Sequence, residues 1–557
     1  MVWLSPIRRL RNLKRRVLRP KADYFWLSLD FVPPERLVRV SWLRSKIEPP
    51  PPPFSIAGFR EILDRLGKDV HTKGIILEIQ TELPFATARS IMDHLVRFQE
   101  EGKKVITFAT HYSLPTYWLA SVGSLVTVQN QGYLWTSGLY FSQTFLGDFL
   151  KKHGLQVEKM AVSPYKSAFD EVARSDIAPE AAENRQALFE SLLETIVQDI
   201  ASKRNLTKKQ VRQAIDQAPL TPKQALELSL IDQEISPEQI PQFLTKAGKP
   251  LRFRSFAMAP KATLIPPKPS MKKLVAIIPV QGVIMDGKSR ETPRGVPVPF
   301  GGRQAGDHTI VPLIRGALAS SRIRAGVLYV DSRGGSATAS ESIRLSLAEF
   351  AACKPLVAYF SNVATSGGYE IATPAHYIVA QPQTITGSIG VLNAKFNFQG
   401  FLEQHQMKTA EFKLGDRADW MQPTKPLGDE ERRVLTELVF HSYDHFLETV
   451  AKSRKLNKQH LRENLAGGRV WTGAQAIQHK LIDEFGNLQT AVNKARELAS
   501  LKATTGVVTM HPPKKPVVPL SFKTTGLPEY VEYVQSLVKT QIWKIEPDLP
   551  LISPFFF

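Results

Sequence analysis

The sequence predicts an α/β protein that contains two tandem copies of one unit. Three observations lead to this prediction. Short apolar runs of strand length alternate with segments of helical periodicity. At a typical ~150 residues per domain, a chain of 557 residues is long enough for several domains. Its two halves also match each other at a nearly constant offset, and alternating strands and helices are typical of parallel sheets with right-handed crossovers.

The internal match extends over most of the chain. Residues 74–77 (GIIL) match residues 326–329 (GVLY) at an offset of 252, which also relates Gly138 to Gly390. Further matches join residues 117–121 to 369–373, 201–206 to 451–456, and 230–232 to 481–483. An offset that stays between 250 and 252 over such lengths indicates a duplication.

Each copy is predicted to contain the same elements in the same order. An apolar strand (74–79; 327–331) leads to a helix (88–101; 340–352), a second strand (104–109; 355–360) and then a short helix. The remainder of each copy is predicted to be mainly helical.

Composition shifts divide the chain into five segments. We expect a basic arm and spacer at 1–53, a first copy at 54–244, a linker at 245–272, a second copy at 273–505 and a tail at 506–557. Five consecutive prolines at 49–53 favour a stiff polyproline II spacer. Because the tail ends in three phenylalanines, we expect it to dock on the body, a partner or lipid.

The overall composition excludes several classes of protein. With 43% hydrophobic residues the chain is globular, and its single cysteine, Cys353, excludes a disulfide framework and paired-cysteine zinc sites. No run reaches the ~18 apolar residues of a membrane-spanning helix. We expect no cofactor, since no phosphate loop or dinucleotide fingerprint occurs, and no metal, since His441 and His445 lack a third ligand. The basic body lacks the interleaved aromatic residues of a nucleic-acid groove.

Much of the net charge of +20 lies at the N-terminus. Residues 1–22 carry eight Lys and Arg and no acidic residue, and their apolar residues recur at steps of three and four. The arginines that interrupt the apolar residues argue against a secretory signal. Such an amphipathic helix can lie in an anionic membrane surface, so we expect peripheral membrane association. A solvated arm, a nucleic-acid contact and a transit peptide stay open as alternatives.

The two copies differ where chemistry is possible. In the second copy Gly334 and Gly335 follow a strand, and Ser366 falls at a turn from strand to helix. Glycine amides can approach a substrate closely and donate to an oxyanion, and a serine at such a turn is an exposed nucleophile. The first copy has Leu114 at the position of Ser366. We expect the carboxylates of Asp331 and Asp416 to be structural.

Three motifs in order now identify a resemblance. Residues 331–336 (DSRGGS), 364–369 (ATSGGY) and 386–390 (TGSIG) resemble the signal peptide peptidase A (protease IV) family in its long, tandem form. A fourth segment, 164–168 (PYKSA), matches the lysine segment of that form, and the resemblance covers about residues 55–505. It implies a fold like those of the crotonases and the caseinolytic proteases. Arg333 stands where the family usually has proline, and we expect no counterpart of the family's usual membrane-spanning helix.

The resemblance also implies roles for individual residues. Ser366 would be the nucleophile, Lys166 the general base, and Ser388 the residue that orients the lysine. Gly334, Gly335 and Gly367 would form the oxyanion hole. Lys413, within residues 411–413 (EFK), resembles the lysine of short, single-copy members and is the alternative base. We favour Lys166 because residues 174–179 (RSDIAP) after it also match the tandem form.

These observations favour a membrane-associated serine peptidase with a Ser-Lys dyad that hydrolyses hydrophobic peptides such as cleaved signal peptides. The resemblance implies a homo-oligomer, a tetramer in the tandem form. Two alternatives are a crotonase-like enzyme acting on acyl-thioesters and a non-catalytic membrane scaffold.

Overall fold

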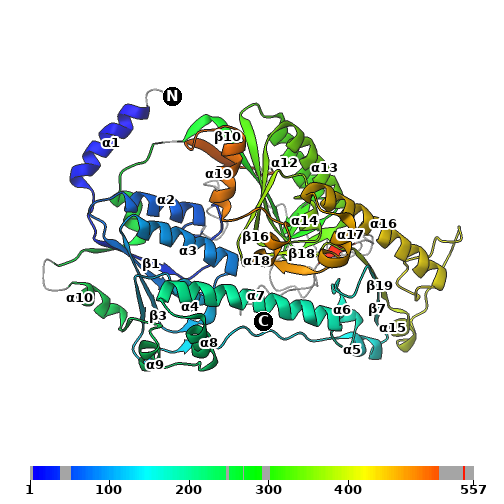
Figure 1. Cartoon of the computed structure of the whole chain (residues 1–557). Coiled ribbons are helices and arrows are strands. Elements are labelled where there is room, and N and C mark those ends of the chain that lie inside the picture. The colour runs from blue at the N-terminus through cyan, green and yellow to red at the C-terminus, as the bar shows by residue number, and fades with distance from the viewer. Residues whose placement is uncertain are drawn as a thin grey trace. The chain divides into compact units, whose positions relative to one another are not determined.

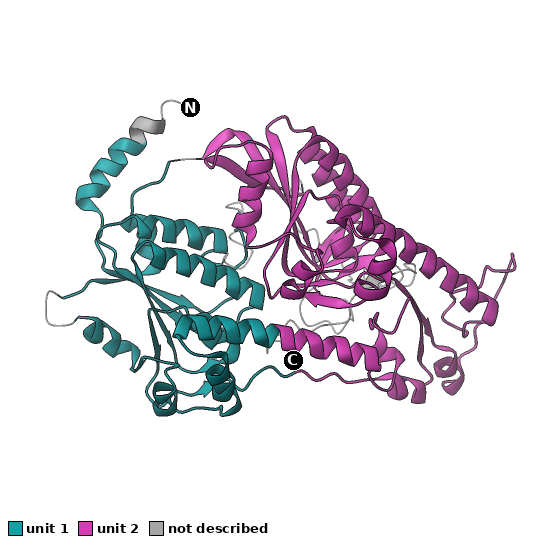
Figure 2. Cartoon of the chain, viewed as in Figure 1, with its two compact units in different colours: residues 1–140, 192–268, 550–557 teal, residues 141–191, 269–549 magenta. Residues whose placement is uncertain are grey.

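The computed structural model describes residues 4–37, 52–245, 250–267, 269–291, 302–512 and 543–545. They form two compact units (Figure 2). Unit 1 comprises residues 1–140, 192–268 and 550–557, and unit 2 comprises residues 141–191 and 269–549. The units therefore do not follow the linear order of the two copies, since residues 141–191 of the first copy belong to unit 2.

Unit 1 contains a six-stranded parallel sheet in the order β8-β5-β3-β2-β1-β9. The strands are β1 (Tyr24–Leu29), β2 (Gly74–Ile79), β3 (Lys104–Ala109), β5 (Leu125–Val128), β8 (Gln233–Glu234) and β9 (Phe253–Ser255). Helices α2 (Ile56–Gly67), α3 (Phe85–Glu100) and α4 (Leu114–Ala120) supply apolar residues to the main core of this unit. Strand β1 falls within the residues expected for the arm, and β9 within those expected for the linker.

Unit 2 contains the larger sheet, in the order β20-β18-β16-β14-β10-β22, with β17 and β21 branching from β16. The strands are β10 (Ser270–Gln281), β14 (Ile323–Ser332), β16 (Leu356–Thr365), β17 (Tyr377–Ala380), β18 (Ile385–Gly387), β20 (Val470–Thr472), β21 (Glu484–Phe485) and β22 (Thr505–Thr509). Val327 and Tyr329 pack on one face of β14, and Leu328 and Val330 on the other. This two-faced burial explains the continuous apolar runs, because the sheet is covered on both sides.

Helices of unit 2 cover the two faces of this sheet. Helices α12 (Asp307–Ala319), α13 (Ala337–Cys353) and α16 (Asp429–Arg454) contribute to one core, and α19 (Leu488–Leu498) contributes to the other. Figure 1 shows α12 and α13 side by side, next to the strands of the large sheet. The long helix α7 (Pro179–Arg204) has residues in both units.

The duplication is visible strand by strand. The order β8-β5-β3-β2-β1-β9 in unit 1 corresponds to β21-β17-β16-β14-β10-β22 in unit 2. Matching contacts accompany it: the hydroxyl of Tyr117 donates to the Leu230 carbonyl at 2.6 Å, and that of Tyr369 donates to the Leu481 carbonyl at 2.8 Å. The α/β fold with two tandem copies and parallel sheets is confirmed.

A second sheet in unit 2 carries the candidate site. Its order is β12-β13-β11-β15-β23-β19-β7. The strands are β7 (Gln156–Ala161), β11 (Val283–Met285), β12 (Arg290–Glu291), β13 (Arg303–Gly306), β15 (Gly334–Ser336), β19 (Leu392–Asn397) and β23 (Trp543–Ile545). It joins residues of the first copy, the second copy and the C-terminal tail.

Helix α1 (Leu4–Leu18) docks on unit 1 through one polar face. The guanidinium of Arg15 donates to the carbonyls of Pro260 and Thr263, and Arg19 pairs with Asp69 at 2.7 Å. Leu10, Leu13, Val17 and Leu18 of the same helix are 62–75% exposed.

Among the described residues, no helix combines the length and the apolar character that crossing a membrane requires.

Candidate active site

Ser366 lies at the turn between the large sheet and a short helix. Strand β16 ends at Thr365, and α14 (Gly367–Glu370) begins at the next residue after the serine. Ser366 has φ 57° and ψ −123°, and its amide donates to the Gly387 carbonyl at 2.8 Å. A serine with positive φ is uncommon, and such strain occurs preferentially at active sites. The turn fixes the direction of the hydroxyl.

Lys166 reaches the same point from the first copy. The segment after β7 carries it, and its Nζ lies 3.0 Å from Ser366 Oγ. The same Nζ donates to Ser388 Oγ at 2.7 Å and to the Ser388 carbonyl at 3.2 Å. All three residues are completely buried, so the exposed hydroxyl expected for Ser366 from its place at a turn is not observed. The structure therefore brings together Ser366, Lys166 and Ser388, which lie up to 222 positions apart.

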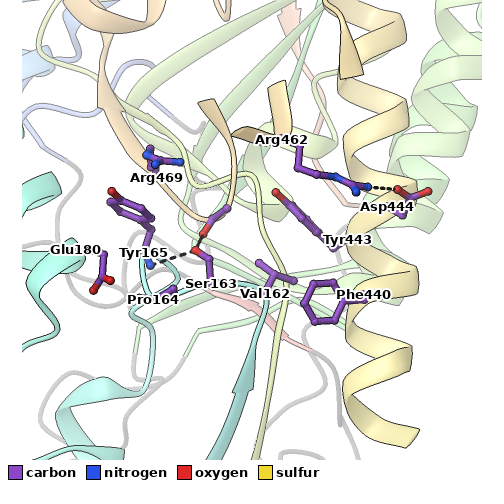
Figure 3. Close-up of a pocket in the computed structure, with 11 residues that line it drawn as sticks. Val162, Ser163, Pro164, Tyr165, Glu180, Phe440, Tyr443, Asp444, Arg462 and Arg469 are labelled. Carbon is purple, nitrogen blue, oxygen red and sulfur yellow. Dashed lines mark hydrogen bonds and ion pairs between the residues drawn. The ribbon is translucent and has the colours of Figure 1, made fainter. Parts of the chain in front are cut away.

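The lysine segment is held by contacts on two sides. On one side, Lys159 of β7 donates to the Lys166 carbonyl at 2.9 Å and pairs with Asp170. On the other side, the hydroxyl of Ser163 donates to the Gly467 carbonyl, a contact drawn in Figure 3. These contacts fix the backbone from which the Lys166 side chain extends.

Gly468 makes the closest approach to the lysine. It has φ +96°, and a Cβ at this position would lie 2.7 Å from the N, Cα and Cβ atoms of Lys166. No real side chain tolerates that distance, so only glycine fits here. The next residue, Arg469, accepts the Ser388 amide at 2.7 Å through its carbonyl. One short segment thus positions both residues.

The glycine strand β15 lies beside the serine turn. A Cβ on Gly367 would lie 3.5 Å from Gly334 Cα, so the two glycine segments are adjacent. The Gly334 amide donates to Ser332 Oγ at 3.1 Å. Gly335 has φ +154°, and a Cβ there would lie 2.0 Å from the Ile284 carbonyl oxygen of β11. Glycine at 335 therefore allows the second sheet to continue next to Ser366.

Asp331 is the half-buried second-last residue of β14, just before this turn. Its carboxylate accepts the Val363 amide at 3.3 Å. Burial raises the pKa of Asp331 to about 6, although hydrogen bonds and the charges of Arg333 and Arg303 act in the opposite direction. The resemblance predicted proline at the position of Arg333. The Arg333 carbonyl accepts a hydrogen bond from the Thr365 hydroxyl at 3.2 Å.

A pocket of about 530 Å³ adjoins the lysine segment. Figure 3 shows Tyr165 on one side and Phe440 and Tyr443 on the other. The guanidinium of Arg469 lies 3.9 Å from the centre of the Tyr165 ring. The segment that carries Lys166 therefore forms part of the wall of this pocket.

Lys413, the alternative base, lies elsewhere. Its side chain is 42% exposed and pairs with Asp419 at 2.9 Å, whereas Lys166 contacts the serine directly. His445 faces Glu341 at 3.5 Å.

Some residues of the site have no motif that reveals them. Lys159 and Asp170 lie in ordinary sequence, and their role depends on a contact with the lysine backbone. The two adjacent glycines at 467 and 468 are visible in the sequence as a possible site of close backbone approach. Because they lie about 300 residues from Lys166 in the chain, the sequence does not show that they contact it.

A family model described as "Peptidase family S49" matches residues 97–248 and 348–502, one segment in each copy. The chain is 31% identical to Protease 4 of Salmonella typhi over 452 residues, which cover 78% of this chain and 70% of that protein. It is 26% identical to the chloroplastic serine protease SPPA of Arabidopsis thaliana, over 87% of this chain and 70% of that protein. A putative signal peptide peptidase SppA of Enterococcus faecium is 32% identical over 42% of this chain and 66% of its own length.

Proposed function

We propose that this chain, which belongs to peptidase family S49 and is a serine-type peptidase, hydrolyses hydrophobic peptides with a Ser366–Lys166 dyad. One observation carries the proposal: Lys166 Nζ lies 3.0 Å from Ser366 Oγ inside a fully buried cluster. A general base must lie within hydrogen-bond reach of the proton that it takes, and this distance meets that requirement.

The surroundings of the lysine support its role as a base. Abstraction of the serine proton requires the neutral amine, and burial in a low-dielectric interior favours that form. A neutral amine has two protons and one lone pair. Donation to the Ser388 hydroxyl and carbonyl uses the two protons and directs the lone pair at Ser366. Ser388 is thus the orienting residue.

The reaction then follows in two acyl-transfer steps. Ser366 Oγ attacks the peptide carbonyl as its proton passes to Lys166 Nζ, and the amides of Gly335 and Gly367 stabilise the oxyanion. The lysine protonates the leaving amine, and an ester of Ser366 remains. Water, deprotonated by Lys166, hydrolyses this ester and releases the new carboxylate.

Hydrophobic peptides, including cleaved signal peptides, are the proposed substrates, in line with the name of the Enterococcus faecium relative. We also propose that the chain acts at a membrane surface through α1, whose exposed leucines and valine lie among arginines. A homo-oligomer, a tetramer in the tandem form, is part of the same proposal. The exposed Phe412 and Leu414, at 98% and 97%, are consistent with self-association.

The test is hydrolysis of an internally quenched hydrophobic peptide by the purified full chain. We expect Ser366→Ala and Lys166→Met each to lower kcat by a factor on the order of 10⁴ or more, as loss of a catalytic unit does. Ser388→Ala should lower kcat less, by about tenfold to a hundredfold, because the base is retained but is less well oriented.

Lys413→Ala is the matched control and should keep activity within about twofold of the wild type. Undiminished activity of Ser366→Ala would overturn the proposal. Loss of activity in Lys413→Ala alone would move the base to that residue.

A further inference from the structure

The pocket beside the lysine segment is separate from the proposed dyad. Its volume of about 530 Å³ lies within the range of ~300–1,000 Å³ that is typical of small-ligand sites. The described residues that line it include neither Ser366, Lys166 and Ser388 nor the glycines of β15. Its walls come from the segment after β7, the start of α7, helix α16 and residues 462–469, all of which belong to unit 2. A ligand in this pocket is therefore held by side chains that the dyad does not use.

One side of the pocket is apolar. Val162, Phe440 and Tyr443 lie together there (Figure 3). Phe440 of α16 is 48% exposed, whereas Tyr443, almost one turn further along the helix, is 5% exposed. Part of this aromatic surface is thus open to solvent, and covering it with a hydrophobic side chain is favourable.

Two opposite charges on the other side of the pocket lack ionic partners. The guanidinium of Arg469 lies over the Tyr165 ring and donates to two backbone carbonyls of its own segment at 3.3 Å, but no described carboxylate pairs with it. Glu180, in the first turn of α7, has neither a hydrogen bond nor an ion pair through its side chain with any described residue. The remaining two charges of the pocket neutralise each other, because Arg462 pairs with Asp444 at 2.6 Å.

A ligand that meets all of these groups has one carboxylate, one ammonium group and apolar side chains. A carboxylate and a guanidinium form strong, charge-assisted hydrogen bonds, and so do an ammonium group and a carboxylate. A short hydrophobic peptide with free termini combines the three features. A fatty acid lacks the ammonium group, and an internal segment of a long chain lacks both terminal charges.

We propose that this pocket is a second peptide-binding site, for short hydrophobic peptides with free termini, in which Arg469 binds the carboxylate and Glu180 the ammonium group. Hydrolysis of hydrophobic peptides releases fragments of this kind, and to that extent the proposal rests on the proposed function. Tyr165 directly precedes Lys166, so a bound fragment contacts the segment that carries the proposed base.

Calorimetric titration of the full-length Ser366→Ala protein with tri-leucine at neutral pH tests the site. We expect N-acetylation of tri-leucine to weaken binding about tenfold or more, because a charge-assisted hydrogen bond is lost. C-terminal amidation should weaken binding by a similar factor, because Arg469 loses its carboxylate. Absence of tri-leucine binding would overturn the proposal.

A substitution at Glu180 identifies the partner of the ammonium group. Glu180→Gln should weaken binding of tri-leucine as much as acetylation does and should leave binding of acetyl-tri-leucine unchanged, since both changes remove the same contact. Glu190→Gln, at an exposed position of the same helix, is the matched control and should bind both peptides like the parent protein. If acetylation weakens binding equally in the parent and in Glu180→Gln, Glu180 is not the partner and the proposal fails.

Blocking the nucleophile separates this site from the proposed active site. Wild-type protein labelled at Ser366 by a serine-directed phosphonate should bind tri-leucine as tightly as the unlabelled Ser366→Ala protein does. Loss of binding on labelling would place the peptide at the nucleophile and overturn the proposal. Failure of the phosphonate to label Ser366 would count against the proposed function alone, because the titrations of Glu180→Gln do not depend on that serine.

Discussion

At the residue scale, the site depends on backbone positions that tolerate no side chain. Gly468 lies against the backbone and Cβ of Lys166, so any larger residue has to displace the lysine. Displacement of a base by about 1 Å can cost on the order of a hundredfold in rate.

We therefore expect Gly468→Ala to lower kcat at least tenfold while the protein still folds, as measured by peptide hydrolysis and circular dichroism. Gly316→Ala is the matched control, since a Cβ there meets no atom within 4 Å. Full activity of Gly468→Ala would show that the lysine segment adapts to the added methyl group.

The raised pKa of Asp331 predicts that the stability of the protein depends on pH. Burial raises its pKa to about 6, compared with 3.8 for the ordinary carboxyl. A raised pKa means that the native state binds the proton more tightly. The resulting stabilisation is therefore complete below about pH 4 and is lost as the pH rises through 6. At neutral pH the buried charge costs up to roughly 3 kcal/mol relative to the protonated form.

We expect Asp331→Asn to raise the melting temperature at pH 8 by a few degrees and to lose this advantage below pH 4. Thermal unfolding of both proteins between pH 4 and 8 measures the difference. A shift of the same size at every pH would refute the titration of Asp331 as its cause.

Much of the site at this scale was predicted from sequence. Ser366, Lys166 and Ser388 were named from motifs, and the structure places them within hydrogen-bond distance of one another, while their catalytic roles stay predictions. Lys159 and Gly468 were not predicted, because their contacts with Lys166 depend on how the chain folds back and not on any local pattern.

At the scale of elements, strand β7 and helix α6 (Asp170–Ala173) together hold the lysine segment. Lys159 extends from β7, and Asp170 opens α6. Their ion pair is largely buried, and Lys159 also donates to the Lys166 carbonyl. Removing one partner of a buried ion pair leaves the other charge uncompensated. Loss of the Asp170 charge is therefore expected to disturb the structure around Lys159.

We expect Asp170→Asn to lower kcat by about tenfold and to change KM little, because the change displaces the proposed base and no group proposed to bind substrate. Glu158→Gln is the control and should keep kcat: Glu158 lies on the same strand as Lys159, and the change weakens its more exposed pair with Arg432 of α16. An increased KM with normal kcat would show that Asp170 supports substrate binding instead.

The strands and helices of the central repeat were largely predictable. The predicted helix at 88–101 corresponds to α3 (Phe85–Glu100), and the predicted strand at 104–109 corresponds to β3 (Lys104–Ala109). The second sheet was not predicted. Several of its strands are two or three residues long, too short for a period of two to be recognised, and their pairing joins distant segments.

At the scale of the whole molecule, the duplication was evident from sequence but the division into units was not. A repeat suggests that each copy folds on its own residues. In the structure, residues 141–191 of the first copy are part of unit 2, to which they contribute Lys166. No local sequence pattern predicts that residues 141–191 belong to unit 2, because the segment keeps its expected place in the linear order of the chain.

The exposed face of α1 predicts binding to anionic membranes. Leu13 and Val17 are 62% and 75% exposed, and Lys and Arg residues surround them. Burying each side chain in lipid is worth roughly 1.5 kcal/mol or more, so replacing both by glutamate should weaken binding on the order of a hundredfold.

Flotation with vesicles of phosphatidylserine and phosphatidylcholine measures this binding. The double variant Leu13→Glu/Val17→Glu should stay unbound, whereas Leu438→Glu, an exposed leucine on α16, should float like the wild type. Equal flotation of all three proteins would refute α1 as the membrane contact.

The wide separation of the site residues in the chain has a consequence for synthesis. Lys166 is translated 200 residues before Ser366, and Gly468, which seals the lysine in place, follows about a hundred residues later still. On the proposed dyad, a ribosome that has made only the first copy carries the proposed base without the proposed nucleophile, and one that has passed Ser366 still lacks the segment around Gly468. With that dyad, the site is complete only after residue 468 has been made, so we expect a shorter nascent chain to be unable to digest the newly made peptides around it.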